Sequence, residues 1–280
     1  MDGSKSSQLR GVIERFVTQL AAETEAAKSS APLLNYLAFC SRFRDYSIHN
    51  CCLIYSQKPD ATRVAGFRAW HKMGRFVRKG ERGIVILAPV LARRHSEETM
   101  EEETNKNPVR FRSVYVFDES QTEGLALPES PILTGADCAD DLALSLVLFA
   151  DSSGIKVKSE TISGSACGVS RGGEIVIDES LAGADYFSVL AHEVAHELLN
   201  HRARHDELDK RSREVEAETV AFTVSRHFNV PCTAPAYLAL HGADAADITA
   251  RLENIVGVTQ QIIRNVEANF DSLNQQASNQ

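Results

Sequence analysis

Two histidines four positions apart, with a glutamate after the first, form the clearest chemical pattern in the sequence: His192-Glu193-x-x-His196. Apolar residues at helical spacing around them predict a buried helix at about 184–202. On a helix, side chains four residues apart lie on one face, so both imidazoles can reach one metal ion. Glu193 could then accept a proton from a water molecule at that ion. The motif predicts a catalytic metal centre with Glu193 as its general base.

A catalytic zinc ion needs a third protein ligand and keeps a fourth position for water. Arg202 stands six residues after His196, where the metzincin arrangement would supply a third histidine. On a continuous helix His201 would lie about half a turn from the site, and His205 could serve only if the helix had ended. The third ligand is therefore expected on another element.

The next predicted helix offers two glutamates on one face. Glu214 and Glu218 share that face with small apolar residues, whereas Glu216 points about 200° away. Carboxylates on a core-facing stripe are costly unless a cation or a donor compensates them. We therefore assign Glu214 to the metal and expect Glu218 to accept a hydrogen bond from His192 or His196. Zn²⁺ is the expected ion, and Mn²⁺ is the alternative for a more open site.

A basic segment precedes this motif in an otherwise acidic chain. The 280 residues carry a net charge of −8, yet residues 42–82 contain ten Lys or Arg and only three acidic residues. Such a segment indicates either a localised site for an anion, with a polyanion as one candidate, or a solvated basic face without a ligand.

The remaining patterns predict an α+β chain of two modules. Prolines at 125–131 mark the boundary, an acid-rich stretch at 93–108 predicts a flexible loop, and glycines and serines at 163–173 predict a turn. We expect helices at about 9–28, 33–46, 139–149, 184–202, 212–228 and 248–270, and strands at about 84–87, 109–117, 155–157 and 174–177.

The composition is that of a globular protein, and it argues against secreted and membrane classes. The first ten residues lack the apolar core of a signal peptide, and no apolar stretch is long enough to span a bilayer. The six cysteines form no C-x-x-C pair, so we expect reduced thiols rather than a disulfide framework. A cytoplasmic location without a membrane partner is the expectation.

The second half resembles the ImmA/IrrE group of H-E-x-x-H metallopeptidases. The resemblance rests on His192, Glu193 and His196, followed by Glu214-x-x-Ala217-Glu218. It implies a mainly helical, zincin-like domain with a small sheet, and it supports Glu214 as the ligand. Glu218 differs from the Asn or Asp that is usual at this position in ImmA and matches ArdC-type proteins.

The first half resembles the N-terminal single-stranded-DNA-binding domain of ArdC antirestriction proteins. The matching segments are 42–50, 59–66, 70–84 and 116–124. The resemblance implies a mixed α/β domain at 1–127 that binds single-stranded DNA, followed by the metallopeptidase domain at 128–280. Cations that could neutralise phosphates and aromatic rings that could stack on bases then give the expected DNA-binding set: Arg44, Tyr46, Arg63, Trp70, Lys72, Arg75, Arg78 and Lys79.

Together these features predict a DNA-associated zinc metallopeptidase that cuts a nearby protein of unknown identity. One alternative is a non-enzymatic antirestriction protein that coats single-stranded DNA and carries a structural metal. The other is a regulatory peptidase of the ImmA kind that cleaves a repressor.

Overall fold

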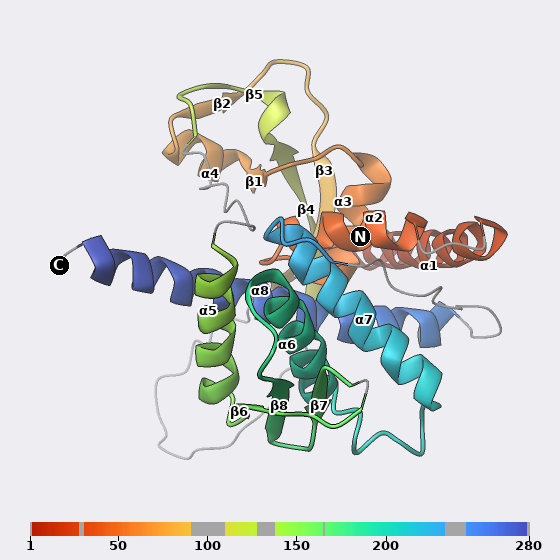
Figure 1. Ribbon diagram of the computed structural model, residues 1–280. Coiled ribbons are helices and arrows are strands. Elements are labelled where there is room, and N and C mark those ends of the chain that lie inside the picture. Colours follow the sequence, from red (N-terminus) through yellow and green to blue (C-terminus); the bar gives the residue numbers. More distant parts are fainter. Residues whose placement is uncertain are drawn as a thin grey trace, which may run out of the picture. The chain divides into compact units, whose positions relative to one another are not determined.

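The computed structural model describes residues 2–27, 31–90, 110–127, 138–164, 166–232 and 245–278. The chain divides into two compact units. Figure 1 labels their helices and strands. Unit 1 comprises Met1–Phe16 and His49–Leu127, and unit 2 comprises Val17–Ile48 and Pro128–Gln280. A division into 1–127 and 128–280 would separate Val17–Ile48 from the rest of unit 2. The acid-rich stretch at 93–108 lies outside the described residues.

Unit 1 combines short helices with two small antiparallel sheets, in the strand orders β1-β4-β3 and β2-β5. Its elements, after the first part of α1 (Asp2–Ala27), are α3 (Ile48–Gln57), β1 (Val64–Gly66), α4 (Phe67–Lys72), β2 (Arg75–Val77), β3 (Ile84–Val90), β4 (Arg110–Asp118), the 3₁₀ turn η1 (Glu119–Gln121) and β5 (Thr122–Gly124).

Two amide side chains of α3 cover the free edge of β3. Asn50 exchanges two hydrogen bonds with the backbone of Leu87, and Gln57 does the same with Val85. The two amides are seven residues apart on the helix, which places them on one face, two turns apart. They satisfy backbone groups that an edge strand would otherwise expose.

Unit 2 is mainly helical and carries one small sheet in the order β6-β8-β7. β6 runs parallel to β8, and β7 runs antiparallel to it. Its elements, after the second part of α1, are α2 (Ala31–Arg42), α5 (Ala139–Ser152), β6 (Lys156–Glu160), β7 (Gly168–Ser170), β8 (Glu174–Asp178), α6 (Gly183–Leu198), α7 (Lys210–His227) and α8 (Ala245–Ser278).

The core of unit 2 forms around α6, which lies between α5 and α7 (Figure 1). Phe187 and Leu190 of α6 are fully buried, and the Phe187 ring meets Phe228 edge-on at the end of α7. Ile175 and Ile177 of the central strand β8 are equally buried. Apolar side chains therefore hold α6 on several sides. This packing fixes the position of the polar side chains that α6 carries.

Several elements differ from the sequence prediction. Helix α6 ends at Leu198 rather than near residue 202, and α2 ends at Arg42 rather than near residue 46. The expected turn at 163–173 contains strand β7, and helices α3 and α4 were not predicted. Short edge strands and helices of six to ten residues carry too little periodicity to be recognised from one sequence.

All six cysteines are free thiols, as expected. None of the helices in the described part of the chain combines the length and the apolar character needed to cross a bilayer.

Candidate functional site

The end of α6 positions the first two site histidines. Asn200 adopts a left-handed conformation with φ of 55°, and its N–H bonds to Glu197 O while the N–H of His201 bonds to His196 O. These two bonds form a Schellman motif, which satisfies the last carbonyls of the helix. The motif stops α6 shortly after His196 and turns the following residues back toward that imidazole.

Three donor atoms from α6 and α7 converge in the structure. The Nε2 atoms of His192 and His196 are 3.0 Å apart, and they lie 3.5 and 3.6 Å from a carboxylate oxygen of Glu214. Ligands at about 2.0–2.1 Å from a tetrahedral zinc ion are separated by about 3.3–3.4 Å. The triangle therefore fits one small divalent cation, with a side left open for a further ligand.

Burial keeps both imidazoles neutral near pH 7. It lowers the pKa of His192, against the opposing charge of Glu214. Burial, together with the neighbouring His192, lowers the pKa of His196 to about 4. Neutral imidazoles have a free lone pair, which is the form that binds a metal.

Strand β7 holds the side chain of Glu193. The backbone N–H of Ser170 bonds to this carboxylate. A Cβ atom at Gly168 would lie 2.9 Å from two Glu193 side-chain atoms and 2.8 Å from Val189, so only glycine allows this close approach. Burial, with Glu214 nearby, raises the pKa of Glu193 to about 7.

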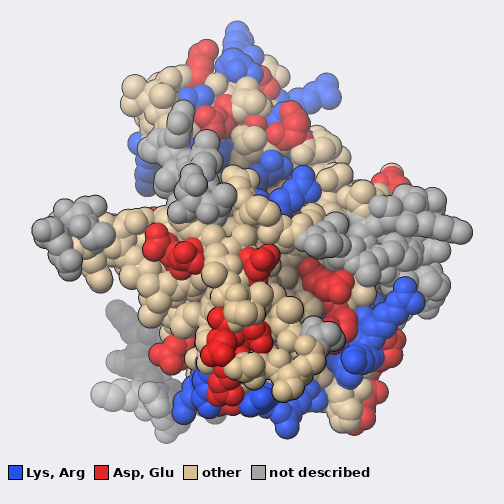
Figure 2. Space-filling view, viewed as in Figure 1, with Lys and Arg blue, Asp and Glu red and all other residues tan. Residues whose placement is uncertain are grey.

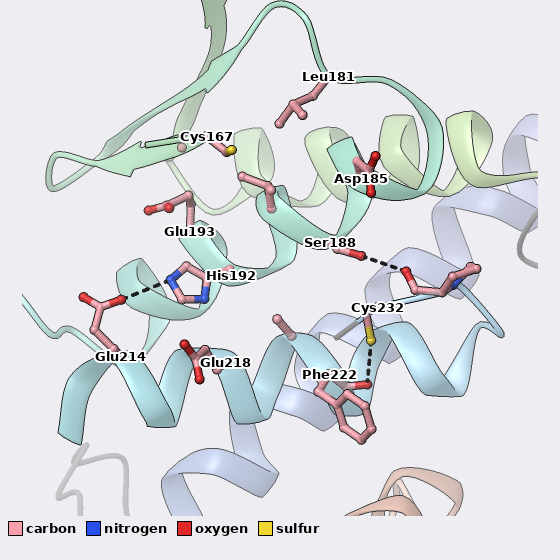
Figure 3. A pocket seen from close by; sticks show the side chains of 14 residues that line it. Cys167, Leu181, Asp185, Ser188, His192, Glu193, Glu214, Glu218, Phe222 and Cys232 are labelled. Carbon is pink, nitrogen blue, oxygen red and sulfur yellow. Dashed lines mark hydrogen bonds and ion pairs between the residues drawn. The ribbon is translucent and has the colours of Figure 1, made fainter. Parts of the chain in front are cut away.

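His192 and Glu214 line a pocket of about 940 Å³ (Figure 3). In this view Glu214 points from α7 toward His192, while Glu193 lies on the β7 side near Cys167. Glu218 lines the same pocket, and its charge, like that of Glu214, partly opposes the lowering of the His192 pKa by burial. Its expected hydrogen bond to a histidine remains a prediction.

A buried polar chain behind His196 was missed in the sequence. The Nδ1 atoms of His196 and His201 are 2.9 Å apart, and His201 Nε2 lies 3.1 Å from Glu216. Arg251 of α8 donates to the other oxygen of Glu216. Each hydrogen bond of this chain has one donor and one acceptor if His196 Nδ1–H donates to His201 Nδ1 and His201 Nε2–H donates to Glu216. This leaves the Nε2 lone pair of His196 facing the metal site.

The expected placement of His201 was therefore wrong, because α6 ends before this residue. Glu216 does point away from Glu214, but only 1% of it is exposed. Burial opposes its ionisation, yet the bonds from His201 and Arg251 lower the pKa of Glu216 overall. The signal for this chain lay in Asn200, a residue type that favours a helix C-terminus.

Among the expected DNA-binding residues, Trp70 is a core residue. Its side chain is fully buried, and Nε1 donates to Phe117 O at 2.8 Å. A ring without exposed surface cannot stack on a base, so the predicted role of Trp70 was wrong.

Arg75 and Arg78 have structural partners within unit 1. Arg75 donates to the Thr122 side chain and to the carbonyls of Thr122 and Leu125, which ties β2 to β5. Arg78 pairs with Glu81 at 2.7 Å. These contacts reduce what either guanidinium can offer to a phosphate.

The other expected residues fall in both units. Arg44 and Tyr46 belong to unit 2, where Arg44 forms an ion pair with Glu267. Lys72 and Lys79 are exposed in unit 1, and Arg63 is half-buried there. On the side of unit 1 seen in Figure 2, Lys and Arg side chains have Asp and Glu side chains among them.

A family model matches part of the N-terminal half of the chain. Residues 10–117 match the N-terminal domain of the anti-restriction factor ArdC. An uncharacterized protein of Bacillus anthracis is 23% identical over 295 residues, which cover 90% of this chain and 49% of that protein. The chain thus spans about half the length of this relative.

Two crystal structures of the antirestriction ArdC protein from plasmid R388 are also similar. The metal-free structure has a TM-score of 0.53 and 17% identity, covering 93% of this chain and 98% of that one. For the Mn(II)-bound structure the TM-score is 0.47 and the identity 18%, covering 84% and 97%.

The ArdC resemblance of the first half is therefore confirmed over residues 10–117. The fold similarity to the metal-free ArdC structure extends along most of the chain. The family match ends before α6 and α7, so the ImmA/IrrE-like character of the second half stays a prediction, and so do the roles of its residues.

Proposed function

We propose that the protein is an ArdC-type antirestriction protein that binds single-stranded DNA through unit 1 and holds one divalent metal ion at His192, His196 and Glu214. The match of residues 10–117 to the ArdC N-terminal domain carries this proposal. The fold similarity to an antirestriction protein along 93% of the chain supports it.

The donor set supports a divalent ion in unit 2. Two neutral imidazoles and one carboxylate suit Zn²⁺, and they also accommodate Mn²⁺. When bound, such an ion supplies positive charge and Lewis-acid activation of water. The chain His196–His201–Glu216 would orient one ligand and hold its proton on Nδ1.

A protection assay tests the proposed function. Unmodified DNA would be introduced as a single strand into cells that carry a restriction system, with and without the full-length protein. We expect the protein to raise the yield of unmodified DNA relative to modified DNA. An unchanged ratio, together with no binding of the purified protein to a labelled single strand, would contradict the proposal.

Peptide hydrolysis at the same centre is a second candidate, and the position of Glu193 favours it. Its carboxylate lies in the pocket that contains His192 and Glu214, and β7 holds it there. From this position Glu193 can accept a proton from an attacking water and deliver it to a leaving amine.

The variant Glu193→Gln separates the two candidates, with Asp185→Asn as a matched control in the same pocket. Metal content, cleavage of a peptide library and DNA protection would be measured for both. Protection that survives Glu193→Gln at full metal content supports the non-enzymatic function. Protection and cleavage lost in Glu193→Gln but kept in Asp185→Asn support hydrolysis.

A further inference from the structure

One face of the β3–β4 sheet in unit 1 carries exposed aromatic rings. Along β4, Phe111 is 43% exposed and Tyr115 is 57% exposed, whereas Val116 is buried. Side chains alternate along a strand, so Phe111, Tyr115 and the half-buried Phe117 share the open face and Val116 belongs to the core face. Phe67 joins this group, because it is 57% exposed and its ring meets Phe117 edge-on at 6.5 Å. We name these four residues the aromatic face.

The neighbouring strand β3 pairs with the aromatic positions of β4. Val85 is the cross-strand neighbour of Tyr115, and Pro89 is the neighbour of Phe111. A Cβ atom at Gly83 would lie 3.0 Å from Tyr115 Cβ and Cδ1 and 3.2 Å from Phe117 Cζ. The rings thus lie close over a residue that has no side chain. Rings two residues apart on the strand are separated by about 6.6 Å along its direction.

Free cations adjoin the aromatic face along the chain. Arg68 follows Phe67, and Arg82 precedes Gly83. Both are exposed, and neither forms an ion pair within the part of the chain that the structure describes. They differ in this respect from Arg78, whose guanidinium is paired with Glu81.

We propose that the aromatic face of Phe67, Phe111, Tyr115 and Phe117 stacks on unpaired nucleic-acid bases, with Arg68 and Arg82 placed to meet the phosphates. This rests on the proposed binding of single-stranded DNA by unit 1, and it moves the contact surface away from Trp70 and Arg75. Every base has a π-face, so stacking on exposed rings binds single strands with little sequence preference. Sheet-borne aromatic rings are used in this way in other single-strand-binding folds.

The chemistry of the face favours a single strand over other partners. In a duplex the bases stack on one another, so rings on a sheet reach only backbone and groove edges. Exposed aromatic residues also occur at protein interfaces. Here Arg68 and Arg82, which adjoin the rings along the chain and form no ion pair among the described residues, favour a polyanion. Oligonucleotide binding that is unchanged in Tyr115→Ala would instead leave the face to a protein partner.

The test compares Tyr115→Ala with Phe76→Ala in the full-length protein. Phe76 is also an aromatic residue of unit 1 and is 50% exposed, but it lies on β2 in the other sheet. The probe is a fluorescently labelled oligothymidine, and binding is followed by anisotropy at several salt concentrations. We expect Tyr115→Ala to weaken binding roughly 10-fold with an unchanged salt slope, because stacking releases no counterions. Tyr115→Phe should restore the affinity, and Phe76→Ala should change it less than 2-fold.

Each result has a distinct meaning. Loss of affinity in Tyr115→Ala with rescue by Tyr115→Phe supports the aromatic face. If the wild type binds the oligonucleotide and Tyr115→Ala and Phe111→Ala bind it with the same affinity, this inference is overturned but the proposed function stays intact. A wild type that does not bind the oligonucleotide contradicts the proposed function itself. Circular dichroism of each variant verifies folding, and Gly83→Ala, which crowds Tyr115 without removing a ring, gives a second and weaker loss.

Discussion

The proposed metal site of unit 2 and the aromatic face of unit 1 hold their chemical groups in opposite ways. His196 and His201 are joined through Glu216 to a third helix, so one side chain depends on the next. Phe111 and Tyr115 stand on an open sheet and touch solvent. Removing one member of a buried polar chain is costly, because its partner is left unsatisfied. Exposed contacts contribute separately, and their charged members weaken with salt.

The largest expected effect tests the metal side of this comparison. His196→Ala should abolish metal binding, because it removes a ligand and leaves His201 without its partner. The purified wild type should contain about one zinc ion per chain. Elemental analysis measures this, with the exposed residue His205 changed to Ala as a control. A His196→Ala protein with full metal content would mean that the ligands are misassigned.

Trp70 and Tyr115 test whether the two aromatic environments of unit 1 really differ. Trp70→Ala should lower the free energy of unfolding by about 3–5 kcal/mol, because it empties a buried site and removes the bond to Phe117 O. Tyr115→Ala should change it by about 0.5 kcal/mol or less. Urea unfolding followed by circular dichroism measures both, and equal losses would place Tyr115 in the core.

His201 should matter for metal affinity although it is not a ligand. His201→Ala should weaken metal binding about 10- to 100-fold, as is typical when a partner of a ligand is lost. His201→Gln offers an acceptor to His196 and a donor to Glu216, so it should recover part of the loss. Competition with a coloured chelator gives the affinities. Identical values for Ala and Gln would indicate a packing role instead.

Asp118 provides a test by pH in unit 1. Its buried carboxylate accepts bonds from the Ser120 hydroxyl and from the N–H groups of Thr62, Arg63 and Ser120. Burial alone would raise its pKa, but these bonds outweigh burial, and the pKa of Asp118 is lowered. Because this pKa is lowered, the contribution of Asp118 to the free energy of unfolding is complete above about pH 4. It is lost as the pH falls further, through the pKa of Asp118 in the folded protein.

Asp118→Asn should therefore cost about 1–2 kcal/mol at pH 7 and should flatten the acid limb of the stability curve. Urea unfolding at a series of pH values measures this. A variant whose stability falls with acid as steeply as that of the wild type would show that another carboxylate is responsible.

The smallest expected effect concerns the cations of unit 1. Replacing Arg68 and Arg82 with Gln should flatten the plot of log affinity against log salt by about 1.4, if each meets one phosphate. Arg75→Gln should leave that slope nearly unchanged, because its guanidinium is held by Thr122 and Leu125. The reverse pattern would restore Arg75 as a phosphate contact.

The convergence of His192, His196 and Glu214 was predictable from sequence because it depends on local geometry. Helical spacing fixes the first two relative to each other, and helical phase separates Glu214 from Glu216. The chain through His201 was not predictable in the same way. It requires α6 to end at Asn200, and it requires Arg251, which is 35 residues from Glu216.

In unit 1, sequence reasoning found the basic segment but placed its contacts poorly. Trp70 and Arg75 have the right chemical types for DNA, yet only tertiary structure shows that one is buried and the other is bonded within the unit. Tyr115 lay in a correctly predicted strand. Which face of that strand meets solvent depends on packing partners that are distant in sequence.

The discontinuity of unit 2 has a consequence for the order of folding during synthesis. Gln260 of α8 donates hydrogen bonds to the carbonyl of Cys40 in α2 and to that of Phe43 just beyond it, across 220 and 217 residues. A nascent chain is made from the N-terminus, so Leu33 and Leu37 of α2 emerge long before the helices that bury them. Contacts of such high sequence separation slow folding. All of unit 1 is synthesised before α7 and α8, which pack on α2. Unit 1 can therefore complete its fold before unit 2 folds.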